Sequence, residues 1–257
     1  MSRIYVFTAM NTEANAILQL AESKGTHQNY VSGVPIHVGS NELHVILSGM
    51  GPKKAKASAT QALRPWLEHN RPSLASHPKP DFVLVTGLCG GLTELVEKGQ
   101  IVAYSNCLAD WKEPALVCGA SLTQCLPEIL TRHGIACRVV DGVTSSRIAT
   151  NRSSREVLSR SGASVVDMES YELLAVAASC EIPAAVLRIV GDSFDQQLPN
   201  FNRAIDADGN FDGHKALAVA LGSPVRTLRL MASNKHALRQ LAPALRIVLS
   251  AHWPMGS

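Results

Sequence analysis

Short apolar runs alternate along the chain with segments that have the apolar spacing of a helix. The first run, residues 4–8, is continuous, as in strands of a sheet that is buried on both faces. Ala14, Ile17 and Leu18 then recur at helical spacing, after Asn11 or Thr12 as a cap. The same alternation predicts strands over 82–86, 99–104, 139–140 and 185–190, and helices after Pro52, over 118–133, around 155–158 and over 173–177. Strands that alternate with helices in this way predict a doubly wound α/β sheet.

Residues 30–47 follow a different pattern, in which short apolar pieces are separated by turn residues. Turns at Gly33 and at Asn41-Glu42 would make this part of the sheet antiparallel, so that the sheet is mixed. Trp111 to Pro114 is predicted to form a loop. Residues 70–80, rich in Pro, Ser and His, predict a surface loop, because a buried strand resumes immediately. We therefore expect a single domain over residues 1–257.

Composition narrows the kind of partner. Hydrophobic residues make up 46% and charged residues 18% of the chain, which excludes wholesale disorder. A net charge of +3 does not favour nucleic acid, so we expect a small-molecule partner. The six cysteines form no CxxC pair, the N-terminus has no signal-peptide pattern, and no apolar run reaches membrane-spanning length. These features favour a cytoplasmic protein with reduced thiols, and we expect neither a metal nor a cofactor.

Acidic residues stand where predicted strands end. Glu169 follows a β-branched pair, Asp192 ends an apolar strand, and Glu13 lies at the start of the first helix. In open α/β sheets the ligand crevice lies outside the carboxyl ends of the strands, which favours a functional role. The alternative is structural, because acids also cap helices and are stabilised near helix N-termini.

Glycines follow two of the predicted strands. Gly49 and Gly51 precede a helix, and residues 87–91 (Gly-Leu-Cys-Gly-Gly) follow the strand 82–86. Such loops let backbone N–H groups approach a polar ligand, although a tight turn without a ligand would use the same residues. The GxGxxG spacing of a dinucleotide site is missing after both strands.

Five motifs together resemble the nucleoside phosphorylase and nucleosidase superfamily, which includes methylthioadenosine/S-adenosylhomocysteine nucleosidases. In chain order they are Ala9-Met10 with Glu13, Ser48-Gly49-Met50-Gly51, Thr86-Gly87-Leu88-Cys89-Gly90-Gly91, Val166-Asp167-Met168-Glu169 and Arg188-Ile189-Val190-Gly191-Asp192. The resemblance implies a three-layer αβα domain with a central mixed, partly parallel, twisted sheet. Residues 198–203 and 207–212, with the final helical run to Leu249, are similar to a hopanoid-associated phosphorylase branch that acts on an adenosylated polycyclic lipid.

The resemblance implies cleavage of a purine N-glycosidic bond and assigns roles to these residues. Asp192 would protonate or hydrogen-bond purine N7, Glu169 would bind the ribose hydroxyls, and Met168 would pack beneath the sugar. Glu13 would activate water. The remaining implied substrate-binding residues are Met10, Met50, Leu88, Cys89, Gly90, Asp167 and Arg188. Relatives assemble as homo-oligomers, so we expect one here.

Hydrolysis and phosphorolysis are distinguished by the residues that would hold phosphate. The first loop contains no Arg or Lys, and Leu88 replaces a hydroxyl donor that is common in the family, so we predict hydrolysis. Lys53 and Lys54 keep phosphorolysis open. The pKa of Asp192 should be raised by burial, and Arg188 would oppose that rise if both side chains faced the same way.

Two departures from the family pattern leave a third hypothesis, a catalytically silent nucleoside-binding protein. Gly191 stands where related nucleosidases often have serine, and residues 143–151 contain no aromatic to stack on the base. Base recognition would then use backbone amides and Ile148, or an aromatic such as Phe194 or Phe201. The amphipathic final helix is predicted to pack on the sheet, with membrane contact the minor alternative.

Overall fold

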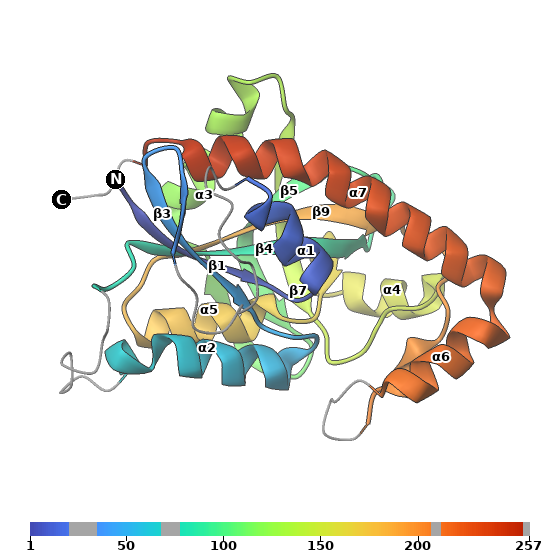
Figure 1. Ribbon diagram of the computed structural model, residues 1–257. Helices are drawn as coiled ribbons and strands as arrows, with labels where there is room; N and C mark the ends of the chain where they lie inside the picture. Colours follow the sequence, from blue (N-terminus) through green and yellow to red (C-terminus); the bar gives the residue numbers. More distant parts are fainter. Residues whose placement is uncertain (21–34, 68–77, 207–211, 254–257) are drawn as a thin grey trace.

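A nine-stranded mixed sheet forms the centre of the computed structural model, which describes residues 1–20, 35–67, 78–206 and 212–253 (Figure 1). The strand order is β2-β3-β1-β4-β8-β7-β5-β6, and β9 pairs with both β4 and β5. The strands are β1 (Arg3–Thr8), β2 (Ile36–Val38), β3 (Asn41–Leu47), β4 (Phe82–Gly91), β5 (Ile101–Ala109), β6 (Lys112–Val117), β7 (Cys137–Thr144), β8 (Val165–Asp167) and β9 (Ala184–Asp192).

Parallel and antiparallel pairs occur together, as predicted. Strand β1 is parallel to β3 and β4, and β4 is parallel to β9, whereas β2–β3, β4–β8, β5–β6 and β5–β9 are antiparallel. The pairings of β4, β8, β7, β5 and β9 also close into a ring, which the prediction of an open sheet did not include. Register shifts in β4 and β5 allow the two ends of each long strand to pair with different neighbours.

Helices cover both faces of the sheet, which confirms the three-layer αβα arrangement (Figure 1). Helices α2 and α5 pack on one face, and α1, α3 and α7 pack on the other. The helices are α1 (Asn11–Leu18), α2 (Pro52–Leu67), α3 (Ala120–Thr131), α4 (Arg152–Ser159), α5 (Ser170–Ser179), α6 (Gly213–Gly222) and α7 (Pro224–Ser250), with a short 3₁₀ helix, η2 (Phe201–Ala204).

The long helix α7 packs on the sheet, as its amphipathic pattern predicts. Leu241, Leu245 and Val248 are buried in the same core cluster as residues of β1, β4 and β9. In the described ranges of the chain, no helix combines the length and the apolar composition that a membrane span requires.

Two predicted boundaries are wrong because tertiary contacts override the local turn signal. The hairpin turn lies at Gly39 and Ser40, and Asn41 begins β3. Gly39 has a φ of +58°, and the Asn41 carboxamide bonds the Ser2 amide and the Leu249 and Ala251 carbonyls. The N-cap position of α1 is Met10, not Asn11 or Thr12. The predicted turn at Gly33 lies outside the described residues, as do most of the loop 70–80 and residues 207–211.

Two predicted loops are strands. Residues 87–91 continue β4, because Gly87 to Gly90 pair with β9, and Gly90 and Gly91 pair with β8. The segment from Lys112 is β6, which pairs with β5 and ends the strand order. An edge strand can contain Pro114, since one side of its backbone forms no ladder bonds.

Candidate active site

One pocket brings together all the residues to which the resemblance assigns a catalytic or substrate-binding role. Its volume is about 290 Å³, close to the lower end of the range of small-molecule sites, roughly 300–1,000 Å³. The three acids Glu13, Glu169 and Asp192 line it although they are far apart in the sequence. The other predicted lining residues found there are Met10, Met50, Leu88, Cys89, Gly90, Asp167, Met168 and Arg188.

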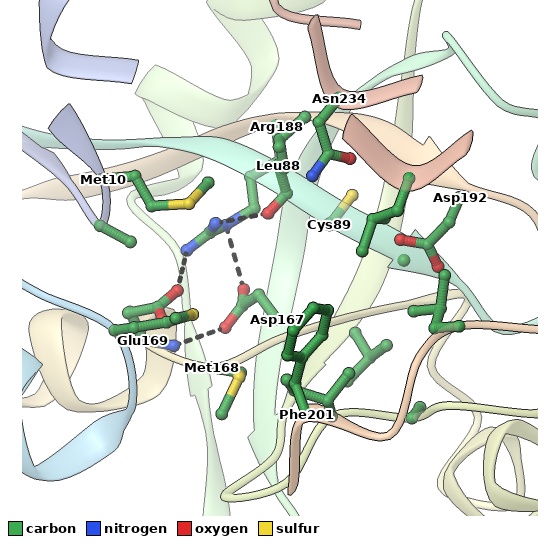
Figure 2. Close-up of a pocket in the computed structure, with 18 of the residues that line it drawn as sticks. Met10, Leu88, Cys89, Asp167, Met168, Glu169, Arg188, Asp192, Phe201 and Asn234 are labelled. Carbon is green, nitrogen blue, oxygen red and sulfur yellow. Dashed lines mark hydrogen bonds and ion pairs between the residues drawn. The ribbon is translucent and has the colours of Figure 1, made fainter. Parts of the chain in front are cut away.

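Arg188 holds the two acids of the β8–α5 connection. Its Nε lies 3.1 Å from Asp167 Oδ2, and its Nη2 donates to Glu169 Oε2 at 3.4 Å (Figure 2). Its Nη1 donates to the Leu88 carbonyl at 2.8 Å. Arg188 is 2% exposed, and the surrounding acids raise its pKa above its ordinary value despite burial. The structure therefore gives Arg188 a structural role at the pocket wall.

Asp167 organises the turn that presents Glu169. Its Oδ1 accepts hydrogen bonds from the Thr144 hydroxyl and from the amides of Glu169 and Ser170. Burial alone would raise the pKa of Asp167, but Arg188 and these hydrogen bonds hold it below its ordinary value. Asp167 is thus an ionised anchor at the start of α5.

Glu169 is buried beside Arg188, with one carboxylate oxygen bonded to backbone. Its Oε1 accepts from the Gly51 amide at 3.0 Å, which connects the β3–α2 loop to the site. Burial raises the pKa of Glu169 to about 7, and Arg188 opposes that rise. The group can therefore change its protonation state near neutral pH.

Glu13 is 3% exposed and accepts three backbone hydrogen bonds. Its Oε2 accepts from the amides of Ala9 and Met10 at 2.9 and 3.0 Å, and its Oε1 accepts from Leu88 at 2.9 Å. Burial raises its pKa, and the hydrogen bond from Leu88 and the charge of Arg188 oppose the rise. A carboxylate has about four acceptor positions, so one remains for a ligand.

Asp192 is paired with an arginine that the sequence analysis did not select. Arg155 Nη2 bonds Asp192 Oδ2, and its Nη1 donates to the Gly91 carbonyl at 2.7 Å. Burial raises the pKa of Asp192 and Arg155 opposes that rise, which is the role that we considered for Arg188. The one available signal for Arg155 was its position three residues before Leu158, on the inner face of α4.

Of the residues considered for base recognition, the structure places Phe201 in the pocket, whereas Phe194 and the backbone of Ile148 are not available to a base. Phe201 lines the pocket, whereas buried Phe194 lies under the Arg152 guanidinium at 4.8 Å and is not part of the lining. The backbone N–H and C=O of Ile148 are both bonded to the Asn202 carboxamide, at 2.8 and 2.9 Å. Ile148 therefore cannot offer these groups to a base unless Asn202 moves.

The structure adds lining residues from elements that the sequence did not connect with the site. Leu230 and Asn234 come from α7, Leu198 precedes η2, and Arg147 follows β7. Asn234 lies on the upper side of the pocket in Figure 2, and Phe201 lies below. Among the described residues, no group of three or more His, Cys, Asp or Glu side chains is arranged to hold a metal ion.

Comparison with solved structures shows the same fold at low sequence identity. Futalosine hydrolase of Helicobacter pylori strain 26695, as a mutant, has 16% identity and a TM-score of 0.69, with 96% of this chain and 98% of that chain covered. The 5′-methylthioadenosine/S-adenosylhomocysteine nucleosidase of Neisseria meningitidis, in complex with methylthio-immucillin-A, has 15% identity, a TM-score of 0.71 and coverages of 97% and 99%. S-adenosylhomocysteine nucleosidase of Streptococcus pyogenes has 14% identity, a TM-score of 0.71 and coverages of 97% and 96%.

The sequence itself identifies the family. Among curated proteins, no sequence matches the chain significantly. The family model described as the phosphorylase superfamily matches residues 3–216 of the 257. The resemblance drawn from the five motifs is confirmed, and the chain belongs to the phosphorylase superfamily.

Proposed function

We propose that the protein hydrolyses the N-glycosidic bond of a purine nucleoside, with adenine as the preferred base. The observation that carries the proposal is that Glu13, Glu169 and Asp192 line one pocket of nucleoside dimensions. Cleavage needs an acid for the leaving base, a group that binds the sugar as it gains positive charge, and a nucleophile on the opposite face. Three separately positioned carboxyl groups suit these three tasks.

The proposed reaction assigns one step to each acid. Asp192 gives a proton to purine N7 as the bond between C1′ and N9 breaks and its electron pair moves to the base. Glu169 accepts hydrogen bonds from the ribose hydroxyls, and these strengthen as the ring becomes cationic. Glu13 takes a proton from water, and the hydroxide oxygen bonds to C1′. The products are the free base and the sugar.

Positions in the pocket support this orientation. Figure 2 shows Glu169 and Met168 on one side of the pocket and Asp192 on the other, with Phe201 between them at the lower edge. The sugar would lie over Met168, whose thioether is polarizable, and the base would extend toward Asp192. Phe201 is the aromatic that we propose to contact the base.

The positions and partners of the pocket's arginines favour water over phosphate as the nucleophile. Arg155 and Arg188 are bonded to acids, and Arg147 is exposed beside Ile148 on the base side. Neither Lys53 nor Lys54 lines the pocket. A phosphate ion opposite the base would therefore lack the positive charge that a phosphate clamp needs.

An exposed apolar surface on α6 and the first half of α7 could bind either the apolar part of a larger substrate or a second subunit. It consists of Leu217, Leu221, Val225, Leu228 and Met231, each at least 59% exposed. It adjoins the pocket residue Leu230, so it suits the apolar group of an adenosylated lipid, and it equally suits a second subunit. We propose a homo-oligomer, which sedimentation equilibrium would test.

A base-release assay tests the reaction and the substrate together. Adenosine, methylthioadenosine and an adenosylated lipid are each incubated with the protein, with and without inorganic phosphate. Equal release of free base without phosphate supports hydrolysis, whereas strict dependence on phosphate would select the phosphorylase alternative. Tight binding without turnover of any of the three would select the silent binding protein.

A further inference from the structure

Asn234 of α7 occupies the space beside Asp192 that a side chain at position 191 would fill. A Cβ atom placed on Gly191 would lie 3.1 Å from Asn234 Oδ1 and 3.3 Å from Leu88 Cδ2. Both contacts are closer than ordinary van der Waals distance, so a side chain at position 191 would push the carboxamide away by a few tenths of an ångström. Gly191 therefore makes room for a polar group supplied by a distant helix.

Helix α7 is fixed to β9 at this point. The Ser233 hydroxyl donates a hydrogen bond to the Gly191 carbonyl, and Ser233 is 3% exposed. One turn further along, Ala237 is buried in the core. The backbone of Asn234 is thus held beside the residue that precedes Asp192, which places the Asn234 side chain near that acid.

The carboxamide itself is available to a ligand. Asn234 lines the pocket, and no hydrogen bond joins its side chain to any other residue in the described part of the chain. Figure 2 shows it projecting from α7 toward the space between Leu88 and Asp192. A partly buried amide without a protein partner, at the edge of a ligand pocket, is suited to bonding a polar group of the ligand.

We propose that Asn234 is a specificity-determining residue that reads the 6-position of the purine. This inference rests on the proposed function, in which Asp192 donates a proton to purine N7. The 6-amino group lies beside N7 on the same edge of adenine, and a carboxamide is the side-chain group that best matches that edge. Asn234 Oδ1 would accept a hydrogen bond from the 6-amino group while Asp192 donates to N7. The ligand class is a 6-aminopurine nucleoside.

The test compares two nucleosides that differ only at position 6. Adenosine carries the amino group, and purine riboside carries hydrogen there. In Asn234→Leu, which keeps the branched shape and the number of heavy atoms of the side chain, kcat/KM for adenosine should fall about tenfold, the loss of one hydrogen bond. The value for purine riboside should change by less than about twofold. An equal fall for both nucleosides would overturn the proposal, because a purely structural role affects them alike.

Two further measurements keep this inference separate from the proposed reaction. Binding of both nucleosides by calorimetry gives the same comparison without turnover: selective weakening of adenosine binding supports the role of Asn234, and equal weakening contradicts it. If neither nucleoside binds the parent protein, both proposals fail. Gly191→Ala, which pushes a methyl group against Asn234, should reproduce the selective loss, and an unselective loss would count against the proposal.

Discussion

Arg155 of α4 and Asp192 at the end of β9 form an ion pair inside the protein, with the Arg155 side chain 1% exposed. The same guanidinium bonds the Gly91 carbonyl at the end of β4, close to the register shift between β4 and β9. Arg155 therefore fixes the direction of the Asp192 carboxylate and lowers its proton affinity, while burial raises it. The pKa of Asp192 is therefore set by two opposing effects, the charge of Arg155 and burial.

Replacing Arg155 with Gln should move the pH dependence of the reaction. Loss of the positive charge raises the pKa of Asp192, so the proposed proton donor stays protonated to higher pH. The alkaline limb of the kcat/KM profile should therefore shift upward, and kcat should fall about tenfold as the carboxyl group loses its orientation. Arg152→Gln is the matched control, because Arg152 is on the same helix but exposed. An unchanged pH profile of kcat/KM for Arg155→Gln would show that Arg155 does not position Asp192.

Asp192→Asn should abolish most turnover while binding is largely kept. The carboxamide has the same shape and can donate a hydrogen bond, but it cannot transfer a proton to the base. A general acid typically contributes a factor of about 10² to 10⁴, so kcat should fall by that amount with a dissociation constant near the parent value. Cleavage at the parent rate would show that Asp192 is not the acid.

Glu169→Gln should change how stability depends on pH. The pKa of Glu169 is raised from 4.5 to about 7 by burial, so the folded state binds more protons than the unfolded state between these values. Parent stability from this group is greatest below pH 4.5 and is lost as pH rises through 7. Glutamine does not titrate, so the free energy of unfolding of the variant minus that of the parent should increase from pH 5 to pH 7.

Urea unfolding at several pH values measures that difference. Glu128→Gln provides the control, because the Glu128 side chain is 64% exposed and lies outside the pocket. A difference for Glu169→Gln that stays constant or decreases across the same window would contradict the burial argument.

Gly87→Ala should disturb Glu13 directly. A Cβ at Gly87 would lie 2.5 Å from Glu13 Oε1, and Gly87 has a φ of +142°. Gly162 also has a positive φ, +89°, but a Cβ placed there would meet no atom within 4 Å, so Gly162→Ala carries the backbone cost alone. We expect Gly87→Ala to lose at least tenfold in kcat/KM beyond any loss in Gly162→Ala, since the proposed base is displaced. Equal activity in the two variants would show that Glu13 is not the catalytic base.

Local patterns located the acids at the strand ends, and the family resemblance assigned them to a site. Asp192 ends an apolar strand and Glu169 precedes an apolar helix, and both features depend on residues within a few positions of each acid. The glycine-rich residues 87–91 show where this approach fails. Glycine is unfavourable in isolated strands, but pairing with β9 and, at its end, with β8 makes this segment a strand.

The amino-acid sequence by itself determined the alternation of strands and helices, the mixed sheet and the acids that line the pocket, because periodicity and strand ends are short-range properties. Only the tertiary structure decided which charges pair and what fills the space around them: Arg155 on Asp192, Arg188 on Asp167 and Asn234 against Gly191. These relationships join residues 21 to 43 positions apart. Burial removes the water that would otherwise form hydrogen bonds with these charged groups. Each charged group must therefore bond another protein group, and the packing of the layers decides which one.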